Sequence, residues 1–355
     1  MGVGERLSAV TVSDLLAQAT AARQAGNSDR EANVLQQLID REPTHLPAIL
    51  MRADNLARCG DRRAATTFFQ HALALARQRG VPAELRPMIE AAGGYLKESA
   101  ELYRQSLRKA VADHREAGLR FQHSVDMLEG SRSISLQEPS AFYVPYLAQR
   151  QYFERDEFSW SGRLEARTAA IRGEVEALLS SAAEFLPYVQ RQANRPARDF
   201  FGLQDDPRWS AFYLYQKGEI VGGNAARCPE TMRALADVPL SRIGERTPSV
   251  FFSLLRAGAH IPPHRGMLNC RLICHLPLIV PDGCWLRVGN ETRSWEDGKL
   301  TIFDDSIEHE AMNDSDRSRI VLIFDIWRPE LSEPEKAGIS AIFNAIDSFT
   351  QISMD

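Results

Sequence analysis

Long hydrophobic runs are missing from this chain. No apolar stretch approaches twenty residues, the length that a helix needs to cross a bilayer. The amino-terminal sequence MGVGERLSAVTVSD also lacks the basic, apolar and small-residue order of a secretory signal peptide. These two absences predict a cytoplasmic protein without a membrane anchor.

An excess of positive charge is missing as well. The 42 lysines and arginines are outnumbered by 47 aspartates and glutamates, which gives a formal net charge of −5. This balance provides no electrostatic basis for binding nucleic acid. The hydrophobic content of 44% and the charged content of 25% are ordinary for globular proteins, and 355 residues are enough for two domains. We therefore expect two folded domains and no nucleic-acid partner.

Cysteine is scarce and odd in number. The five cysteines have no metal-ligand spacing along the chain: Cys59, Cys228, Cys270, Cys274 and Cys284. Cys270 and Cys274, within NCRLICH, leave a Cys-x3-Cys-His metal site as an alternative. Strand alternation places both on one face, where small side chains are usually buried. We interpret both as core residues, and unpaired thiols fit a reducing compartment.

Helical patterns fill residues 11–80. Two segments, LLAQATAARQAG and LPAILMRADNLARCG, each end at a glycine followed by Asn or Asp, and each precedes a second helical run. The glycines, Gly26 and Gly60, are 34 residues apart, a spacing that resembles the tetratricopeptide repeat. A third helical pair is expected over residues 84–118. We predict a helical domain over residues 1–129, which is either a groove for a peptide or protein substrate or an element for stability and oligomerisation.

The rest of the chain is rich in strand-forming sequence. After a serine-rich linker at residues 130–140, residues 141–355 contain short β-like runs separated by Gly, Pro, Asn and Asp: SVFFSLL, CRLICHLPLIV, CWLRVG, KLTIFD and RIVLIFDIW. This rhythm is typical of an antiparallel sandwich or barrel. We also expect a hairpin around Lys217 and Gly218, a surface helix within LEARTAAIRGEVEALL and a carboxy-terminal helix.

Three polar residues at the ends of these runs suggest a functional site. His264 and His309 lie where imidazoles from neighbouring strands can converge on one cation. Arg319 begins the run RIVLIFDIW, and an arginine that points into a β-barrel needs an anionic partner to offset its desolvation. A metal beside a buried arginine suggests a cosubstrate that carries a carboxylate.

The sequence between residues 140 and 335 carries a specific set of motifs: FYVPYLAQRQYFERDEFSW, PHRGMLNCRL, CHLPLIVP, GCWLRVGNETRSWEDGKLTIFDDSIEHEAMNDSDRSR and DIWRPEL. Together they resemble the catalytic domain of the aspartyl/asparaginyl β-hydroxylase family. The resemblance implies an Fe(II)- and 2-oxoglutarate-dependent dioxygenase on a double-stranded β-helix of the jelly-roll or cupin type. With the helical repeats ahead of it, the chain is expected to be an α+β protein.

The resemblance assigns the metal ligands. His264 of HRG and His309 of EHE match the two iron-binding histidines of the family. Most 2-oxoglutarate oxygenases add a carboxylate ligand two residues after the first histidine. Here that residue is Gly266, and the family is similar in lacking this ligand and using water instead.

The resemblance also assigns the cosubstrate site. Arg319 and Ser253 match the residues that hold the distal carboxylate of 2-oxoglutarate, and His275 matches a histidine near its other end. The chain departs from the family at Ile273, where the animal enzymes have an arginine that helps to hold carboxylates. Arg271 remains and is expected to take over part of that role.

Simpler explanations exist for several of these residues. His264 could be a loop histidine bonded to backbone, and Arg319 could pair with an acidic neighbour, Asp314 or Asp316. His275 and Arg271 are as well explained by the core as by the site. Other polar residues have these expected roles: Glu308 and Glu310 orient His309 or are solvated, and His260 is structural. Asp304 and Asp305 are expected to cap the turn before His309, and the less favoured alternative is that they supply a carboxylate ligand.

The expected reaction is hydroxylation of an aspartyl or asparaginyl side chain in a peptide or protein, with release of succinate and CO2. Within enzymes, the alternatives are a free amino acid, a natural-product intermediate or a lipid acyl chain. Outside enzymes, the alternative is a non-catalytic adaptor that binds a partner through its repeats. The sequence carries no signal for the oligomeric state or for the stereochemistry of hydroxylation.

Overall fold

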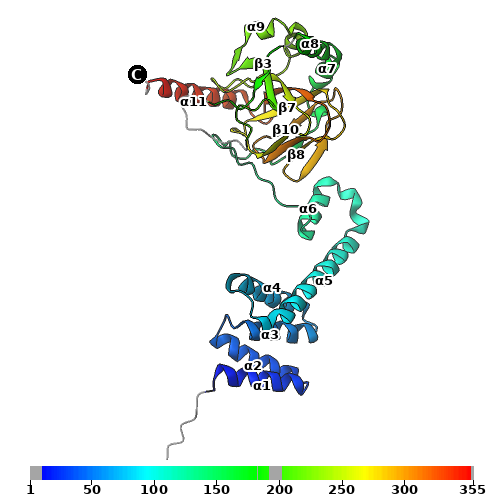
Figure 1. Ribbon diagram of the computed structural model, residues 1–355, viewed down its shortest axis with the longest axis vertical. Coiled ribbons are helices and arrows are strands. Elements are labelled where there is room, and N and C mark those ends of the chain that lie inside the picture. Colours follow the sequence, from blue (N-terminus) through cyan, green and yellow to red (C-terminus); the bar gives the residue numbers. More distant parts are fainter. Residues whose placement is uncertain (1–9, 182, 192–201, 353–355) are drawn as a thin grey trace, which may run out of the picture. The chain divides into compact units, whose positions relative to one another are not determined.

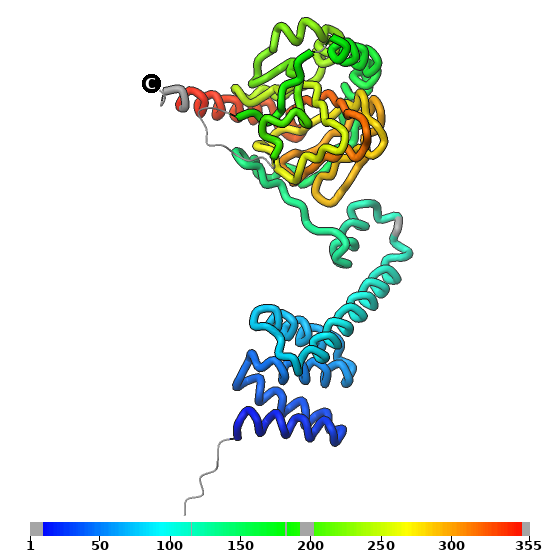
Figure 2. The backbone as a smooth tube through the Cα atoms, viewed as in Figure 1, coloured from blue at the N-terminus to red at the C-terminus, as the bar shows by residue number. Residues whose placement is uncertain are grey.

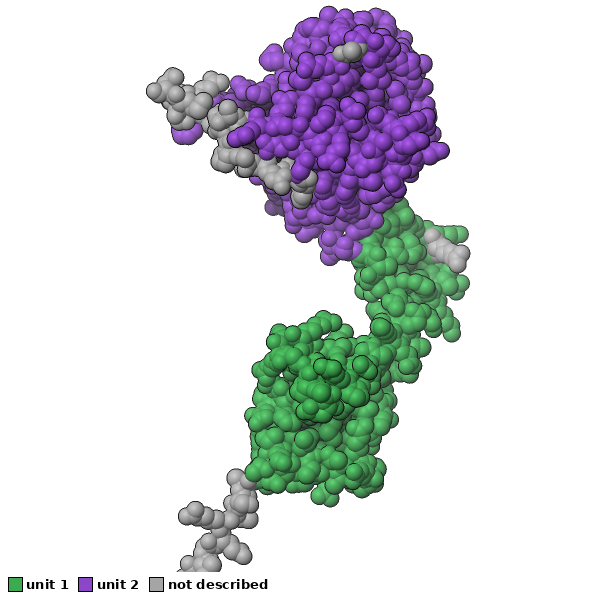
Figure 3. Space-filling model, in the orientation of Figure 1, with its two compact units in different colours: residues 1–132 green, residues 133–355 purple. Residues whose placement is uncertain are grey.

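The chain divides into two compact units, residues 1–132 and 133–355 (Figure 3). The computed structural model describes residues 10–181, 183–191 and 202–352. The expected domain ends at residues 1 and 355 lie outside this part. The boundary between the units falls inside the expected linker at 130–140, and residues 133–140 of that linker belong to the second unit. Among the described helices, none is long and apolar enough to cross a membrane.

The first unit is helical throughout its described part (Figure 1). Its α-helices are α1 Val12–Gln24, α2 Ser28–Arg41, α3 Leu46–Arg58, α4 Arg62–Arg79, α5 Arg86–Ala110 and α6 Leu119–Glu129. Two 3-10 helices, η1 Ala83–Leu85 and η2 Ala112–Ala117, flank α5. The unit thus has the helical character that the sequence predicts.

The helix pairs α1/α2 and α3/α4 turn at the expected glycines. Gly26 and Gly60 have φ angles of 69° and 86°, a region that residues with a Cβ rarely adopt. The next residues begin the second helices, because the Asn27 and Asp61 side chains each accept a hydrogen bond from the backbone of the following helix. The identity of these pairs as tetratricopeptide repeats stays a prediction.

The expected third helical pair over residues 84–118 is wrong. Residues 86–110 form one continuous helix, α5, which Figure 2 shows as an uninterrupted coil. Gly93 and Gly94 lie inside it without a positive φ. A glycine in a helix costs only about 1 kcal/mol relative to alanine, and packing of the buried Ala92 with α3 and α4 offsets that cost. The two glycines therefore do not break the helix.

The second unit contains two antiparallel sheets. The large sheet has the strand order β1-β10-β7-β12-β5-β3-β2, with β4 beside β3, and the small sheet has the order β6-β11-β8-β9. The strands of the large sheet are β1 Tyr152–Phe153, β2 Leu186–Pro187, β3 Trp209–Gln216, β4 Glu219–Ile220, β5 Val250–Leu255, β7 Arg271–Ile279, β10 Thr301–Phe303 and β12 Arg319–Trp327. Those of the small sheet are β6 His260–His264, β8 Cys284–Val288, β9 Glu291–Ser294 and β11 His309–Asn313.

The strands from β5 to β12 wind between the two sheets. β5, β7, β10 and β12 are neighbours in the large sheet, and the intervening β6, β8, β9 and β11 make up the small one. This alternation is the double-stranded β-helix that the resemblance implied, so the fold prediction is confirmed. Three of its strands were not expected from the sequence: β9, β6 with its two prolines and the short β11. β6 and β11 each carry a histidine of the candidate site.

Helices cover the outer face of the large sheet, as Figure 1 shows for α7 and α8. The helices of this unit are η3 Arg155–Glu157, α7 Ser161–Glu165, α8 Thr168–Ser180, α9 Gly222–Ala225, α10 Pro229–Ala234 and α11 Glu333–Ile352. Side chains of α8 such as Ile171 and Val175 pack with even-numbered residues of β7 and β12. The hairpin at Lys217 and Gly218 is confirmed, with both residues at positive φ.

Alternation along β7 decides which side chains reach the space between the sheets. Leu272, Cys274 and Leu276 face the helical cover, and the odd-numbered residues face the opposite way. Cys270 and Cys274 are fully buried and unpaired, each within a hydrophobic cluster. Their interpretation as core residues is confirmed.

Candidate functional site

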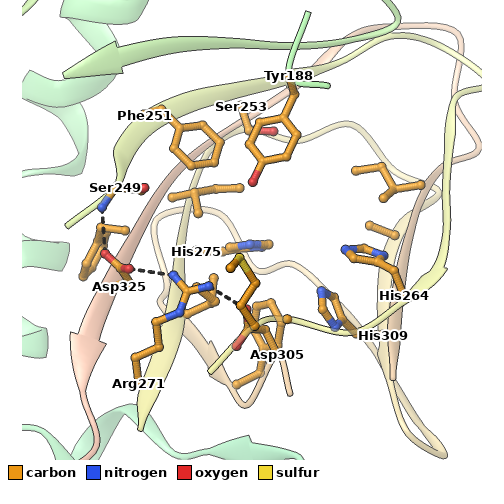
Figure 4. Close-up of a pocket in the computed structure, with 18 of the residues that line it drawn as sticks. Tyr188, Ser249, Phe251, Ser253, His264, Arg271, His275, Asp305, His309 and Asp325 are labelled. Carbon is orange, nitrogen blue, oxygen red and sulfur yellow. Dashed lines mark hydrogen bonds and ion pairs between the residues drawn. The ribbon is translucent and has the colours of Figure 1, made fainter. Parts of the chain in front are cut away.

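A cavity of about 370 Å³ lies between the large and small sheets. Strands from both sheets line it, and the six residues assigned to the site from the sequence all do so: Ser253, His264, Arg271, His275, His309 and Arg319. Figure 4 shows His264 and His309 on one side of the cavity and Arg271 with Asp325 on the other. The fold therefore brings together residues that are up to 66 positions apart in the chain.

Strand register places the two histidines side by side. β6 and β11 pair antiparallel, with His264 at the end of one strand opposite His309 at the start of the other. The centroids of the two imidazole rings are 4.1 Å apart. Each Nδ1 lies within hydrogen-bond distance of a backbone carbonyl two residues earlier, 2.8 Å from Pro262 and 3.0 Å from Ile307. Because a carbonyl only accepts, each Nδ1 carries the proton and each Nε2 keeps a lone pair for a metal.

Burial favours the neutral form of both imidazoles. Burial lowers the pKa of His264, and burial followed by the proximity of His264 lowers the pKa of His309 well below its ordinary value. Neutral imidazole is the form that binds divalent iron. The backbone carbonyls, and not Glu308 or Glu310, orient the rings.

Those acidic residues have other partners. Glu310 accepts hydrogen bonds from His260, at 2.7 Å, and from Arg287. Glu308 pairs with Arg265 at 3.3 Å. The structural role expected for His260 is confirmed by this pairing, and the option that the glutamates orient His309 is wrong.

The room for a third protein ligand is already filled. A Cβ atom added at Gly266 would lie 2.1 Å from Oδ2 of Asp305, far inside van der Waals contact. A carboxylate at position 266 is therefore sterically incompatible with Asp305 in its present place. In residues 10–181, 183–191 and 202–352, no group of three His, Cys, Asp or Glu side chains is placed to hold a metal. His264 and His309 are the two candidate ligands that the described residues bring together, and the absence of a carboxylate ligand stays a prediction.

Asp305 departs from the capping role expected for it. Asp304 does cap the turn, because its Oδ1 accepts a hydrogen bond from the Ser306 backbone at 3.0 Å. Asp305 instead accepts a bond from Arg271 at 3.0 Å, and its Oδ1 has no partner in the described part of the chain. Burial raises the pKa of Asp305 to about 6. Its free oxygen is thus available to a group inside the cavity.

Arg319 is a buried cation that has no counter-ion among the described residues. Its side chain is 1% exposed, and neither Nε nor Nη1 has a hydrogen-bond partner among the described residues. Its guanidinium lies 4.8 Å from the ring centre of Trp295, and burial lowers its pKa to about 10. The alternative ion pair with Asp314 or Asp316 does not form in the described structure. A buried guanidinium with unpaired N–H groups fits an anionic ligand.

Ser253 and His275 lie near Arg319 on the same inner face. Ser253 on β5 stands opposite Val321 on β12, two residues after Arg319, and its Oγ accepts a hydrogen bond from Trp209 at 3.3 Å. His275 is buried between Trp295 and Phe303, and its Nδ1 lacks a partner within the described residues. Burial, and then Arg319, lowers the pKa of His275 well below its ordinary value. We call Ser253, His275 and Arg319 the Arg319 region.

Arg271 has a different environment from Arg319. Its two terminal nitrogens donate to Asp325 at 2.6 Å and to Asp305 at 3.0 Å (Figure 4). Each terminal nitrogen therefore already bonds a carboxylate. This pairing argues against the role of cosubstrate ligand that the sequence suggested for Arg271. Its neighbours facing the cavity are Phe251, Ile273 and Ile323. We call Arg271, Asp325 and these three apolar residues the Arg271 region.

Sequence reasoning missed one residue that supports both histidine loops. Gln137 is buried, and its Nε2 donates to Asp304 at 2.6 Å while its Oε1 accepts from Asn269 at 3.0 Å. Asp304 lies in the loop before His309, and Asn269 lies in the loop after His264. Gln137 belongs to the segment expected to be a linker, where a lone polar residue gives no signal of burial. Only the fold reveals it.

The chemistry of this donor set fits iron(II) and 2-oxoglutarate. Two neutral imidazoles present Nε2 lone pairs in one cavity, and the same cavity contains a buried guanidinium that needs an anion. The cavity volume lies at the lower end of the range usual for small-molecule sites. Both the metal and a dicarboxylate can therefore be held by residues already in place.

Comparison with known proteins gives the family of this domain. Residues 165–329 match the family model described as Aspartyl/Asparaginyl beta-hydroxylase. The chain is 39% identical to human aspartyl/asparaginyl beta-hydroxylase over 141 residues, which cover 39% of this chain and 18% of that protein. It is 37% identical to the ornithine lipid ester-linked acyl 2-hydroxylase of Rhizobium tropici over 190 residues, which cover 53% of this chain and 63% of the relative.

A third relative matches over a longer stretch. Human aspartate beta-hydroxylase domain-containing protein 2 is 31% identical over 214 residues, which cover 59% of this chain and 56% of that protein. The chain thus spans less than two thirds of each of these relatives. The matched segment contains both paired histidines, the buried arginine and the strands that position them. Residues 165–329 therefore form a domain of the aspartyl/asparaginyl β-hydroxylase family.

Proposed function

We propose that this protein is an iron(II)- and 2-oxoglutarate-dependent hydroxylase. The observation that carries the proposal is the location of Arg319 in the same cavity as the paired His264 and His309. Arg319 is a buried cation whose Nε and Nη1 have no partner in the described part of the chain. An unpaired buried guanidinium is costly unless a ligand neutralises it. A dicarboxylate that also chelates the metal is such a ligand.

Each residue then has a defined task. His264 and His309 hold iron(II) through Nε2, and their backbone hydrogen bonds keep the rings in the required orientation. Arg319 and Ser253 bind the far carboxylate of 2-oxoglutarate, and the planar guanidinium fixes its direction as well as its charge. When bound, iron supplies the oxidation chemistry by which O2 and 2-oxoglutarate become a hydroxylated product, succinate and CO2.

Two substrate classes are supported by the relatives. The name of the family and of the human relative points to an aspartyl or asparaginyl side chain, which is also the expectation from the sequence. The name of the Rhizobium tropici relative points to an acyl chain. Binding of a peptide by the helical unit and a cytoplasmic location stay predictions.

The first experiment measures cofactor binding separately from turnover. The protein is reconstituted with iron(II) without oxygen, and 2-oxoglutarate is added while the visible charge-transfer absorption of the iron–2-oxoglutarate chelate is followed. Exposure to O2 then allows succinate to be measured. Wild-type protein is expected to bind one iron per chain, to develop the band and to release succinate slowly even without a substrate.

Variants at the two histidines test the assignment of the metal site. His264→Ala and His309→Ala are expected to lose iron, the absorption band and succinate formation together. His260→Ala is the matched control, because this exposed histidine pairs with Glu310 on the same two strands and lies outside the cavity lining. Absence of iron binding by the wild-type protein would contradict the proposal and favour a non-catalytic adaptor.

A further inference from the structure

The basic residues that line the cavity differ in whether they are free to meet a ligand. Apart from the histidines, four cations line it: Arg246, Arg265, Arg271 and Arg319. Within residues 10–181, 183–191 and 202–352, the first three already have carboxylate partners. Arg319 alone among these four has no carboxylate partner in that part of the chain. The Nε of Arg271 is also unpaired there, but the terminal nitrogens of Arg271 bond two carboxylates.

Arg246 and Arg265 each have a carboxylate partner at the edge of the cavity. Arg246 bonds Asp347 of α11, and Arg265 bonds Glu138 at 2.9 Å as well as Glu308. Arg271 lies deeper and bonds two carboxylates, Asp305 and Asp325. Each of these sites is electrically neutral or acidic. An additional carboxylate would meet a cation that is already neutralised.

The cosubstrate requires Arg319, the one arginine of the lining that has no carboxylate partner among the described residues. On the proposed function, Arg319 binds the distal carboxylate of 2-oxoglutarate, so no unpaired arginine of the described lining is left for an acidic substrate. Moving an unpaired carboxylate from water into a buried site is strongly unfavourable. The charge distribution therefore disfavours an aspartyl side chain as the group that reacts.

The walls of the Arg271 region are apolar. Strand register brings its side chains together: Ile323 of β12 stands opposite Phe251 of β5, and Asp325 stands opposite Ile273 of β7. Tyr188 extends this wall, with its ring 5.3 Å from that of Phe251. Three apolar side chains and the Tyr188 ring thus line this part of the cavity, and the Tyr188 hydroxyl points into it (Figure 4). Such a lining favours an aliphatic group.

One hydroxyl in this region lacks a partner. Thr247 Oγ1 is buried, lines the cavity four residues before Phe251, and has no hydrogen bond within the described structure. This hydroxyl can donate to one carbonyl, such as that of an acyl ester or amide. A peptide segment brings an N–H and a C=O for every residue, and these would lose water without gaining partners along an apolar wall.

We propose that the substrate presents an uncharged aliphatic acyl chain to the site, and that Ile273, Ile323 and Phe251 determine this specificity. The inference rests on the proposed function, because it names the substrate of the same site. In the reaction, one C–H bond of the chain becomes C–OH with one atom of O2. The other oxygen atom enters succinate, and 2-oxoglutarate loses its carboxylate as CO2.

The test compares defined probes on the full-length protein loaded with iron(II) and 2-oxoglutarate. The acyl probes are the N-methylamides of octanoic, decanoic and lauric acid. The peptide probes are short capped peptides centred on Asp, Asn or Leu. Mass spectrometry detects addition of one oxygen atom, and succinate release is measured in parallel. We expect oxygen in at least one acyl amide, with succinate released at least about tenfold faster than without substrate.

Two variants locate the specificity. Ile273→Arg adds a cation to the apolar wall and is expected to lower acyl turnover at least about tenfold, while Ile273→Leu, the matched control, retains it. Ile323→Thr provides a second variant with little change in volume, and its KM for the acyl amide is expected to rise. The affinity for 2-oxoglutarate, read from the charge-transfer band, is expected to change less than about twofold in all three.

The outcomes separate the two proposals. If the wild-type protein does not form the iron–2-oxoglutarate band, the proposed function fails. If the band forms but no acyl amide gains oxygen, the inference about the substrate is overturned and the proposed function stands. The inference about the substrate is also overturned if the Asp, Asn or Leu peptide is oxidised as fast as the acyl amides or faster. Oxygen in the acyl amides alone, with loss in Ile273→Arg, supports it.

Discussion

Two buried arginines of one cavity have opposite environments. Arg271 bonds Asp305 and Asp325 through its terminal nitrogens, whereas Arg319 has two nitrogens without partners in the described chain. Arg319 and Asp325 are six residues apart on β12, so their Cα atoms are separated by about 20 Å along the strand. The contrast teaches that a buried charge stabilises the fold only where the fold supplies its partner. Where it does not, the charge is available for a ligand.

The largest expected effect is at Arg319. Arg319→Met is expected to weaken 2-oxoglutarate binding at least about 100-fold, because the carboxylate loses its charged, bidentate partner. The same variant is expected to raise the unfolding free energy of the protein without cofactors by at least about 1 kcal/mol, since an unpaired buried charge is removed. Titration by the charge-transfer band and urea unfolding measure the two quantities.

The control for this variant is Arg319→Lys. It keeps a buried positive charge but loses the planar fork, so it is expected to weaken 2-oxoglutarate binding without a gain in stability. If Arg319→Met instead destabilised the protein without cofactors, Arg319 would be a structural residue like Arg271. The contrast between the two arginines would then not hold.

Arg271 is expected to behave in the opposite way. Arg271→Met leaves Asp305 and Asp325 buried without their shared partner, and the unfolding free energy of the second unit is expected to fall by about 3–5 kcal/mol. Urea unfolding followed by tryptophan fluorescence measures this fall. In protein that remains folded at low temperature, the affinity for 2-oxoglutarate is expected to stay within about fivefold of wild type. A loss as large as that of Arg319→Met would show that Arg271 also binds the cosubstrate.

A smaller effect on the site is expected from a substitution at Gly266, which lines the cavity next to Asp305 and two residues after His264. Gly266→Ala places a Cβ atom 2.1 Å from the Asp305 carboxylate, which Arg271 holds in place. We expect iron affinity to fall about 10- to 100-fold, as is usual when groups that support metal ligands are displaced. Equilibrium dialysis against iron(II) without oxygen measures this change.

Gly173→Ala in α8 is the matched control. No atom lies within 4 Å of the added Cβ, and the residue is helical, so iron affinity is expected to be unchanged and stability to rise by up to about 1 kcal/mol. Unchanged iron affinity in Gly266→Ala would show that Asp305 can move away at little cost. Asp305 would then not exclude a side chain at position 266.

The smallest effect is expected at Gln137, which joins the two histidine loops. Gln137→Leu leaves Asp304 and Asn269 without one hydrogen-bond partner each, and the unfolding free energy is expected to fall by about 1–3 kcal/mol. Iron affinity is expected to fall less than tenfold, because the histidines keep their own backbone bonds. Gln216→Leu, at an exposed end of β3, is the control and is expected to change neither quantity.

Local sequence patterns predicted much of the fold. Apolar runs separated by turn residues gave five of the strands, β5, β7, β8, β10 and β12, because burial between packed layers requires apolar side chains at regular positions. Glycines followed by Asn or Asp predicted the end of the first helix in each of the first two pairs, α1 and α3. The expected break within α5 was wrong, since tertiary packing outweighs the small helix cost of Gly93 and Gly94.

The candidate site was predicted less completely than the fold. His264, His309 and Arg319 could be nominated because residues of these types at strand ends imply metal and anion chemistry. The different roles of Arg271 and Asp305 could not be predicted, because they depend on which carboxylate lies nearest across strands. The role of Gln137 could not be predicted for the same reason. Hydrogen bonds between residues more than 100 positions apart leave no pattern in a single sequence.

By itself, the sequence determined the helical first half, the strand-rich second half and the residue types that the site requires, since these follow from periodicity, turn chemistry and side-chain chemistry near each residue. The tertiary structure decided the partners. Register between β6 and β11 set His264 beside His309, and register across β5, β12 and β7 separated a free arginine from a paired one. Pairing depends on long-range packing, and the availability of a charge for function depends on pairing.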